Sequence, residues 1–118
     1  MKYSDRRLAK RFSLTIPMYI RPWKSAALEE KVESVNVSAF GVYFETDIPP
    51  SAGATMQIRL EMPLEITGDP TVEWQCLGKV TRIQPGISSH GLRGVGVRFE
   101  YYEVSPATLP ASALLQNN

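Results

Sequence analysis

Strict alternation of apolar and polar residues in short segments is the feature that most constrains the fold of this chain. It is clearest in residues 56–62, where every even position is apolar: Met56, Ile58, Leu60 and Met62. A period of two is typical of a β-strand with one buried face. Comparable segments recur between turns rich in Pro, Gly, Asp and Ser, and we interpret five more of them as strands: residues 12–20, 28–37, 42–45, 72–80 and 95–99.

The connections between these segments are too short for the crossovers that parallel strands need, so we expect antiparallel pairing. Closure into a barrel would leave no exposed sheet edge. A chain of 118 residues holds one ordinary core and one domain. The prediction is an all-β, six-stranded antiparallel barrel over residues 12–104. Residues 105–118 are predicted to form a short C-terminal helix or tail, because Ser105 can cap a helix and Pro106 can take its first position.

The net charge of +1 conceals a local cluster of cations near the N-terminus. Residues 1–12 contain five basic residues and one acidic residue, a charge of +4, whereas the rest of the chain has eight basic and eleven acidic residues, a charge of −3. Such a local cluster suits a small anionic ligand better than a nucleic-acid polymer, which usually meets a basic stripe. We therefore interpret residues 1–12 as a flexible basic arm that binds an anion and expect no nucleic-acid polymer as partner. A solvated tail without a ligand is the alternative.

Several other classes of function lack the residues they need. His90 is the only histidine, and no serine or cysteine is recognisably paired with a base, so we predict no enzymatic activity. The lone Cys76 leaves no cysteine pair for zinc, and we predict no metal site and no cofactor. No segment approaches the roughly 18 apolar residues of a membrane span, and the N-terminus lacks the apolar core of a secretory signal. A soluble, cytoplasmic protein without membrane insertion is expected.

The first group of candidate binding residues lies in the basic arm. Arg7 and Arg11 are four residues apart just before the first predicted strand, and Arg6 precedes them. The planar guanidinium group binds phosphate through two parallel hydrogen bonds and also matches the O6 and N7 acceptors of guanine. The two arginines could converge on one ligand from a turn.

The second group lies in residues 36–41. Asn36 and Ser38 share a face at strand spacing, and we expect Val35 and Val37 to point into the core. Asn36 offers donors and an acceptor, and Ser38 offers a rotatable hydroxyl. Gly41 could let a ligand approach the backbone or supply a positive φ. For this segment alone, a plain turn is the alternative.

Taken together, the two groups resemble the PilZ domain family, whose signature is an RxxxR motif before the first strand and a [D/N]xSxxG motif between the second and third strands. Residues 7–11 read RLAKR and residues 36–41 read NVSAFG, so both motifs are complete. The resemblance extends to Gly53 and to residues 94–99 and covers about residues 5–104. It implies a six-stranded PilZ-type β-barrel that serves bacteria as a receptor for the second messenger cyclic di-GMP.

Carried over by position, the resemblance assigns the ligand contacts to residues of both motifs: Arg7, Arg11, Asn36, Ser38 and Gly41. A cation at the position of Arg6 suggests a stacked dimer of the ligand, since an extra guanidinium can stack on a base. Trp74 and Arg82 are possible further contacts, although Trp74 shares the parity of core positions. Because the arm has no apolar anchor before Leu8, we expect cyclic di-GMP to order it on binding.

Two other functions are alternatives to the receptor. A PilZ-fold adaptor that binds another protein but no nucleotide is the main alternative, and the complete motifs argue against it. A single-stranded nucleic-acid binder should carry aromatic and basic residues together on one sheet face, whereas Arg59, Lys79 and Arg98 alternate with acidic residues. With no catalytic or transmembrane segment predicted, we expect the chain to act through an unidentified downstream protein partner.

Overall fold

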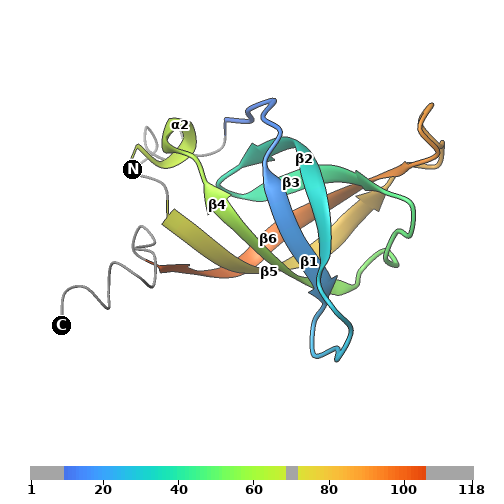
Figure 1. Ribbon diagram of the computed structural model, residues 1–118, viewed down its shortest axis with the longest axis horizontal. Helices are drawn as coiled ribbons and strands as arrows, with labels where there is room; N and C mark the ends of the chain where they lie inside the picture. Colours follow the sequence, from blue (N-terminus) through green and yellow to red (C-terminus); the bar gives the residue numbers. More distant parts are fainter. Residues whose placement is uncertain (1–9, 69–71, 106–118) are drawn as a thin grey trace.

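The computed structural model describes residues 10–68 and 72–105, which form a closed barrel of six strands (Figure 1). Around the barrel the strands follow the order β1-β2-β3-β6-β5-β4, and every neighbouring pair is antiparallel. The predicted all-β, six-stranded antiparallel barrel is confirmed. The strands are β1 (Pro17–Pro22), β2 (Glu30–Ser38), β3 (Gly41–Thr46), β4 (Thr55–Met62), β5 (Val72–Ile83) and β6 (Arg93–Ser105).

The alternating pattern of the sequence fills the interior of the barrel. On β4 the inward side chains are Met56, Ile58, Leu60 and Met62, and none of them is more than 3% exposed. Phe44 of β3 is completely buried among them. Full burial of such side chains stabilises the fold by about 1.5–3 kcal/mol each, so the core rather than the connecting loops determines the register of the strands.

The first strand begins later than predicted. Residues 12–16 alternate as expected, and Phe12, Leu14 and Ile16 pack against the core, but regular pairing starts only at Pro17. The reason lies in β2, where the hydroxyl of Ser34 accepts a hydrogen bond from the amide of Ile16 at 2.9 Å and donates one to the carbonyl of Leu14. The side chain of Ser34 thus replaces part of the backbone hydrogen bonding between residues 14–16 and β2. The alternation of apolar residues cannot predict this replacement.

A β-bulge in β2 reverses one expectation about its side chains. The register with β3 shifts between Ser34 and Asn36, and the extra residue, Val35, is 43% exposed instead of pointing into the core. Val37 is completely buried, as expected. Because a bulge changes which parity faces inward, Ser34 is buried before it and Val37 after it.

The described part of the chain contains one helix, the four-residue α2 (Leu64–Thr67) between β4 and β5, which the sequence pattern did not predict. The predicted C-terminal helix falls in residues 106–118, outside the described residues. Ser105 is the last residue of β6, so the strand extends one residue past the predicted boundary of the barrel. No helix among residues 10–68 and 72–105 is long and apolar enough to cross a membrane.

Candidate functional site

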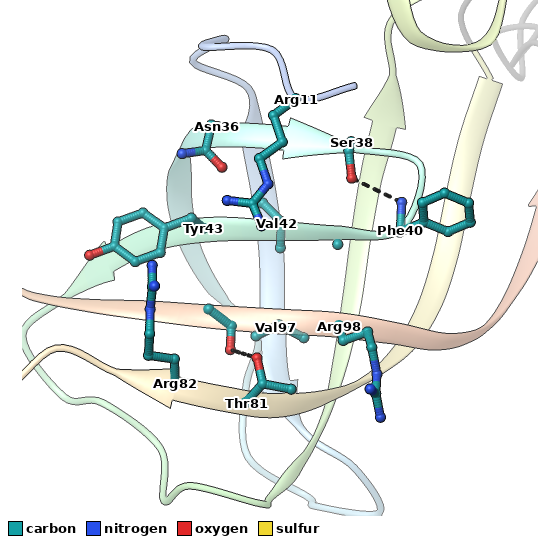
Figure 2. A pocket seen from close by; sticks show the side chains of 12 residues that line it. Arg11, Asn36, Ser38, Phe40, Val42, Tyr43, Thr81, Arg82, Val97 and Arg98 are labelled. Atoms are coloured by element: carbon teal, nitrogen blue, oxygen red, sulfur yellow. Dashed lines mark hydrogen bonds between the residues drawn. The ribbon is translucent and has the colours of Figure 1, made fainter. Parts of the chain in front are cut away.

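A pocket of about 510 Å³ lies on the outer surface of the barrel, across the neighbouring strands β2, β3, β6 and β5 (Figure 2). Its volume falls within the roughly 300–1,000 Å³ typical of small-molecule sites. The residues that line it come from distant parts of the sequence: Arg11, Asn36, Ser38, Phe40, Gly41, Val42, Tyr43, Thr81, Arg82, Gly96, Val97 and Arg98.

Arg11 enters the pocket because the next residue is fastened to β2. The amide of Phe12 donates to the carbonyl of Val37, and the amide of Val37 donates to the carbonyl of Phe12, both at 2.9 Å. Figure 2 shows the side chain of Arg11 extending between Asn36 and Ser38 towards β3. Arg11 itself is exposed, so its guanidinium group is available to a ligand.

Asn36 and Ser38 both line the pocket from β2, which confirms that they share one face. Ser38 also shapes the turn into β3, because its hydroxyl accepts a hydrogen bond from the amide of Phe40 at 3.0 Å. A hydroxyl that accepts this bond retains its own proton for donation. Among the described residues, no acceptor takes the Ser38 proton.

Glycines at the base of the pocket leave it free of side chains. A Cβ atom on Gly41 would lie 2.4 Å from the carbonyl oxygen of Val97 on β6, so only glycine fits where these two strands pass. The φ angle of Gly41 is not positive. The close approach of β6, and not an unusual turn conformation, is therefore the reason for glycine at this position. Gly96 also lies at this base, in the strand that pairs with both β3 and β5.

The far wall of the pocket is formed by Tyr43 and Arg82. Tyr43 packs directly over Gly94, since a Cβ atom on Gly94 would overlap the tyrosine hydroxyl. The guanidinium carbon of Arg82 lies 5.5 Å from the centre of the Tyr43 ring, within the range of a cation–π contact. The bulge between Val80 and Arg82 redirects this part of β5 and brings Arg82 to the site.

The described residues that line this pocket include three arginines and no carboxylate; the arginines are Arg11, Arg82 and Arg98. Arg98 has one acidic contact, a 3.4 Å ion pair with Glu100 in which both side chains are largely exposed. Such an exposed pair contributes roughly 0–1 kcal/mol and leaves the guanidinium free to exchange partners. The site is therefore suited to an anion.

A second hollow of about 490 Å³ lies on the outside of β1 and β4, but its cation is already neutralised. Arg59 forms ion pairs with Glu29 at 3.0 Å and with Glu73 at 3.1 Å, and it lies over the ring of Tyr19. The hydrogen bond from Arg59 lowers the pKa of Glu29. With both glutamates charged around one arginine, this hollow does not attract an anion.

Comparison with known proteins agrees with this architecture. A profile of the PilZ domain family matches residues 5–109. The chain belongs to the PilZ domain family. PilZ domains are receptor or adaptor domains rather than enzymes. The chain is also similar to the solved structure of the Bacillus subtilis inhibitor of motility MotI/DgrA, with a TM-score of 0.60 and 19% sequence identity.

That similarity covers 91% of this chain but only 46% of MotI/DgrA, so this PilZ domain spans less than half the length of its structural relative. At this level of identity, the likeness concerns the fold alone. No curated protein sequence matches the chain.

The structure brings four of the six predicted PilZ site residues together. Asn36, Ser38 and Gly41 of the NxSxxG motif and Arg11 of the RxxxR motif line the pocket, whereas residues 6 and 7 lie outside the described residues. Sequence reasoning placed Arg82 only among possible contacts and did not select Tyr43, Thr81 or Arg98. Thr81 and Arg98 have no local signal, because they meet the motifs only through the pairing of β6 with β3 and β5. Tyr43 is paired with Asn36 in the hairpin of β2 and β3, and only its place two residues after Gly41 could have pointed to it.

Two other residues with potential chemistry lie away from the pocket. Trp74 is 5% exposed and stacks on Tyr102, which confirms its expected place in the core. Cys76 is buried next to it on β5, and burial raises the pKa of its thiol to about 12. A thiol in such surroundings stays protonated and unreactive near neutral pH.

Proposed function

We propose that this PilZ domain is a receptor for cyclic di-GMP and binds the dinucleotide in the pocket on β2, β3, β5 and β6. The observation that supports the proposal is the composition of the pocket: both family motifs contribute to a site in which the lining residues that the structure describes include three arginines and no carboxylate. A cyclic dinucleotide carries two phosphate charges and two flat bases. The guanidinium groups of the pocket can bind the phosphates, and the glycines at its base leave room for the flat bases.

The polar groups match the chemistry of guanine and phosphate. A guanidinium group can bind a phosphate through two hydrogen bonds or the O6 and N7 atoms of guanine in the same geometry. The amide of Asn36 can accept a hydrogen bond from a guanine amino group and donate another, and the free proton of Ser38 can be donated to a ligand oxygen. Asn36 carries no charge, so it contributes a directed contact without repelling phosphate.

The basic arm is part of the same proposal. Arg11 is positioned by the backbone pair between Phe12 and Val37, and in the proposed complex Arg6 and Arg7 close over the dinucleotide. Signalling then consists of ligand-induced ordering of residues 1–12, which presents a different surface to a downstream protein. Hydrogen exchange of the amides in residues 1–12 tests this step: slower exchange at saturating ligand is expected, and unchanged exchange would rule it out.

Isothermal titration with cyclic di-GMP tests the binding itself. The full chain is compared with Arg7→Ala and Arg11→Ala, and with Arg21→Ala as a matched control, because Arg21 is an arginine of β1 that does not line the pocket. We expect saturable binding that both motif variants weaken by about tenfold or more and that the control retains. The stoichiometry distinguishes one ligand molecule from the stacked dimer suggested by Arg6.

Cyclic di-AMP serves as the ligand control, since it has the same phosphate ring without the O6 acceptor of guanine. It should bind more weakly than cyclic di-GMP. Absence of heat with a folded protein would contradict the receptor and favour the nucleotide-free adaptor. Equal loss of affinity in Arg21→Ala would show that general charge, and not the pocket, attracts the ligand.

A further inference from the structure

Within the described part of the chain, the second half of β6 has one edge without a partner strand. Residues 93–98 of β6 pair with β3, and the last backbone bond on that side runs from the amide of Phe99 to the carbonyl of Phe40 at 2.8 Å. From Glu100 to Ser105 the strand pairs only with β5. Among residues 10–68 and 72–105, no strand occupies the opposite edge. In Figure 1 the orange-red end of β6 extends alongside β5 beyond β2 and β3.

The side chains along this edge alternate between two kinds. The bulge at Glu100 is followed by regular pairing with β5, in which Tyr102 and Val104 are opposite the buried Cys76 and Trp74, and Tyr101 and Glu103 point to the other face. The apolar members are unusually open to solvent, with exposures of 54% for Tyr101 and 48% for both Tyr102 and Val104. One face of the edge is thus apolar and the other is aromatic and acidic.

Tyr101 and Tyr102 of the edge each make a side-chain contact. The ring of Tyr102 stacks on Trp74 with their centres 4.2 Å apart and their planes at 3°. The hydroxyl of Tyr101 donates to the carboxylate of Glu103 at 2.8 Å. Side chains that are already ordered lose little conformational entropy when a partner binds.

We propose that the edge formed by Glu100–Ser105 binds an extended segment of a partner protein as an additional antiparallel or parallel strand. Strand addition uses the free backbone groups of an exposed edge for affinity and alternate side chains for specificity. The partner segment that fits has apolar side chains at alternate positions, which pack on Tyr102 and Val104. Its intervening side chains are basic and meet Tyr101 and Glu103.

Charge favours such a partner over a second copy of this chain. The edge carries the carboxylates of Glu100 and Glu103, and residues 99–105 include no lysine or arginine. The nearest preceding cation in the sequence, Arg98, is paired with Glu100. Two copies joined edge to edge would bring four carboxylates together, and like charges on paired strands are destabilising. Charged edge strands also discourage pairing between identical copies.

The probe is a synthetic hexapeptide of alternating lysine and valine, capped at both ends, added to the isotopically labelled full chain and followed by NMR. A hexapeptide of alternating glutamate and valine is the matched control. We expect the basic peptide to shift the backbone amide signals of residues 100–105 and to slow their hydrogen exchange, and the acidic peptide to do neither. The double variant Glu100→Lys with Glu103→Lys should weaken binding of the basic peptide about tenfold, whereas Glu33→Lys on β2 should not.

Each contrary result overturns the inference. Equal binding of the two peptides would mean that the edge does not select a basic segment. Shifts without slower exchange in residues 100–105 would mean that no strand is added. A dimer in sedimentation experiments without peptide, with residues 100–105 protected, would assign the edge to a second copy. The edge shares no residue with the pocket, so the experiment is done without cyclic di-GMP and its result does not depend on the proposed receptor function.

Discussion

Phe12, which precedes β1, and Val37 of β2 donate a backbone hydrogen bond to each other, at 2.9 Å each, and form an isolated bridge. This pair fixes the chain one residue after Arg11 and next to both polar residues of the second motif. The two motifs, 25 residues apart in sequence, are therefore brought together by backbone geometry before any ligand is present. Pre-organisation of this kind reduces the entropy that a ligand must overcome.

The buried hydroxyl of Ser34 holds the residues that follow Phe12 against β2, and its removal should lower the stability of the fold. In Ser34→Ala the amide of Ile16 and the carbonyl of Leu14 lose their side-chain partner. Buried backbone groups without a partner cost about 1–3 kcal/mol, so the free energy of unfolding in urea should fall by about that amount. Ser25→Ala is the control, because its hydroxyl bonds only within an exposed turn. Equal effects of the two variants would contradict the role assigned to Ser34.

Gly41→Ala should destabilise the barrel because of its contact with β6. The new methyl group would lie 2.4 Å from the carbonyl oxygen of Val97, which belongs to the backbone of a paired strand and can move little. Forced overpacking of this kind costs about 1–3 kcal/mol. Gly86→Ala is the matched control, since Gly86 lies in the β5–β6 turn with open space around it and no positive φ. Thermal unfolding should show a lower midpoint for Gly41→Ala only; an unchanged midpoint would mean that the strands can separate locally.

The barrel could be predicted from the sequence because the physical cause is local. Alternation in residues 56–62 specifies both a strand and its buried face, and turn residues mark the ends. The features that the sequence did not predict depend on single hydrogen bonds and on the pairing of strands. The hydroxyl of Ser34 replaces backbone hydrogen bonds at residues 14–16. The bulge at Val35 exposes an apolar side chain. The second half of β6 was missed because residues 101–104 do not alternate in polarity and are largely exposed.

Only the part of the candidate site that belongs to the two motifs could be predicted from the sequence. Asn36, Ser38 and Arg11 stand in fixed spacings that point to one ligand surface. Arg82 and Arg98 complete the pocket through the register of β5 with β6, which pairs Arg82 with Gly96 and Lys79 with Arg98. The register between two strands is a property of the folded barrel. The residue spacing within β5 or β6 alone therefore cannot predict that Arg82 and Arg98 line the pocket.

Arg82→Ala therefore tests whether the far wall contributes to ligand binding. Loss of a charge-assisted hydrogen bond costs about 1.5–3 kcal/mol, which corresponds to a decrease in affinity for cyclic di-GMP of about tenfold or more. Lys79→Ala removes a cation from the same strand at a position that does not line the pocket. Titration calorimetry should show weaker binding for Arg82→Ala and nearly normal binding for Lys79→Ala. If both variants weaken binding equally, Arg82 acts only through long-range charge.

Cys76 should make the stability of the barrel decrease at alkaline pH. Burial raises the pKa of its thiol to about 12 in the folded state, whereas the thiol of the unfolded chain has a pKa of about 8.5. Between these values the unfolded state releases a proton that the folded state keeps, so increasing pH favours unfolding by up to about 1.4 kcal/mol per pH unit. Below pH 8 the thiol is protonated in both states and contributes no pH dependence.

The measurement is the free energy of unfolding in urea between pH 7 and pH 10.5 for the native sequence and for Cys76→Ala. Tyrosines and lysines also titrate in this range, and because both proteins contain them, the difference between the two curves isolates the thiol. We expect the curves to run parallel below pH 8 and the native sequence to lose stability faster above it. Curves that stay parallel to pH 10.5 would show that the thiol ionises as readily in the barrel as in the unfolded chain, and hence that water reaches Cys76 in the folded protein.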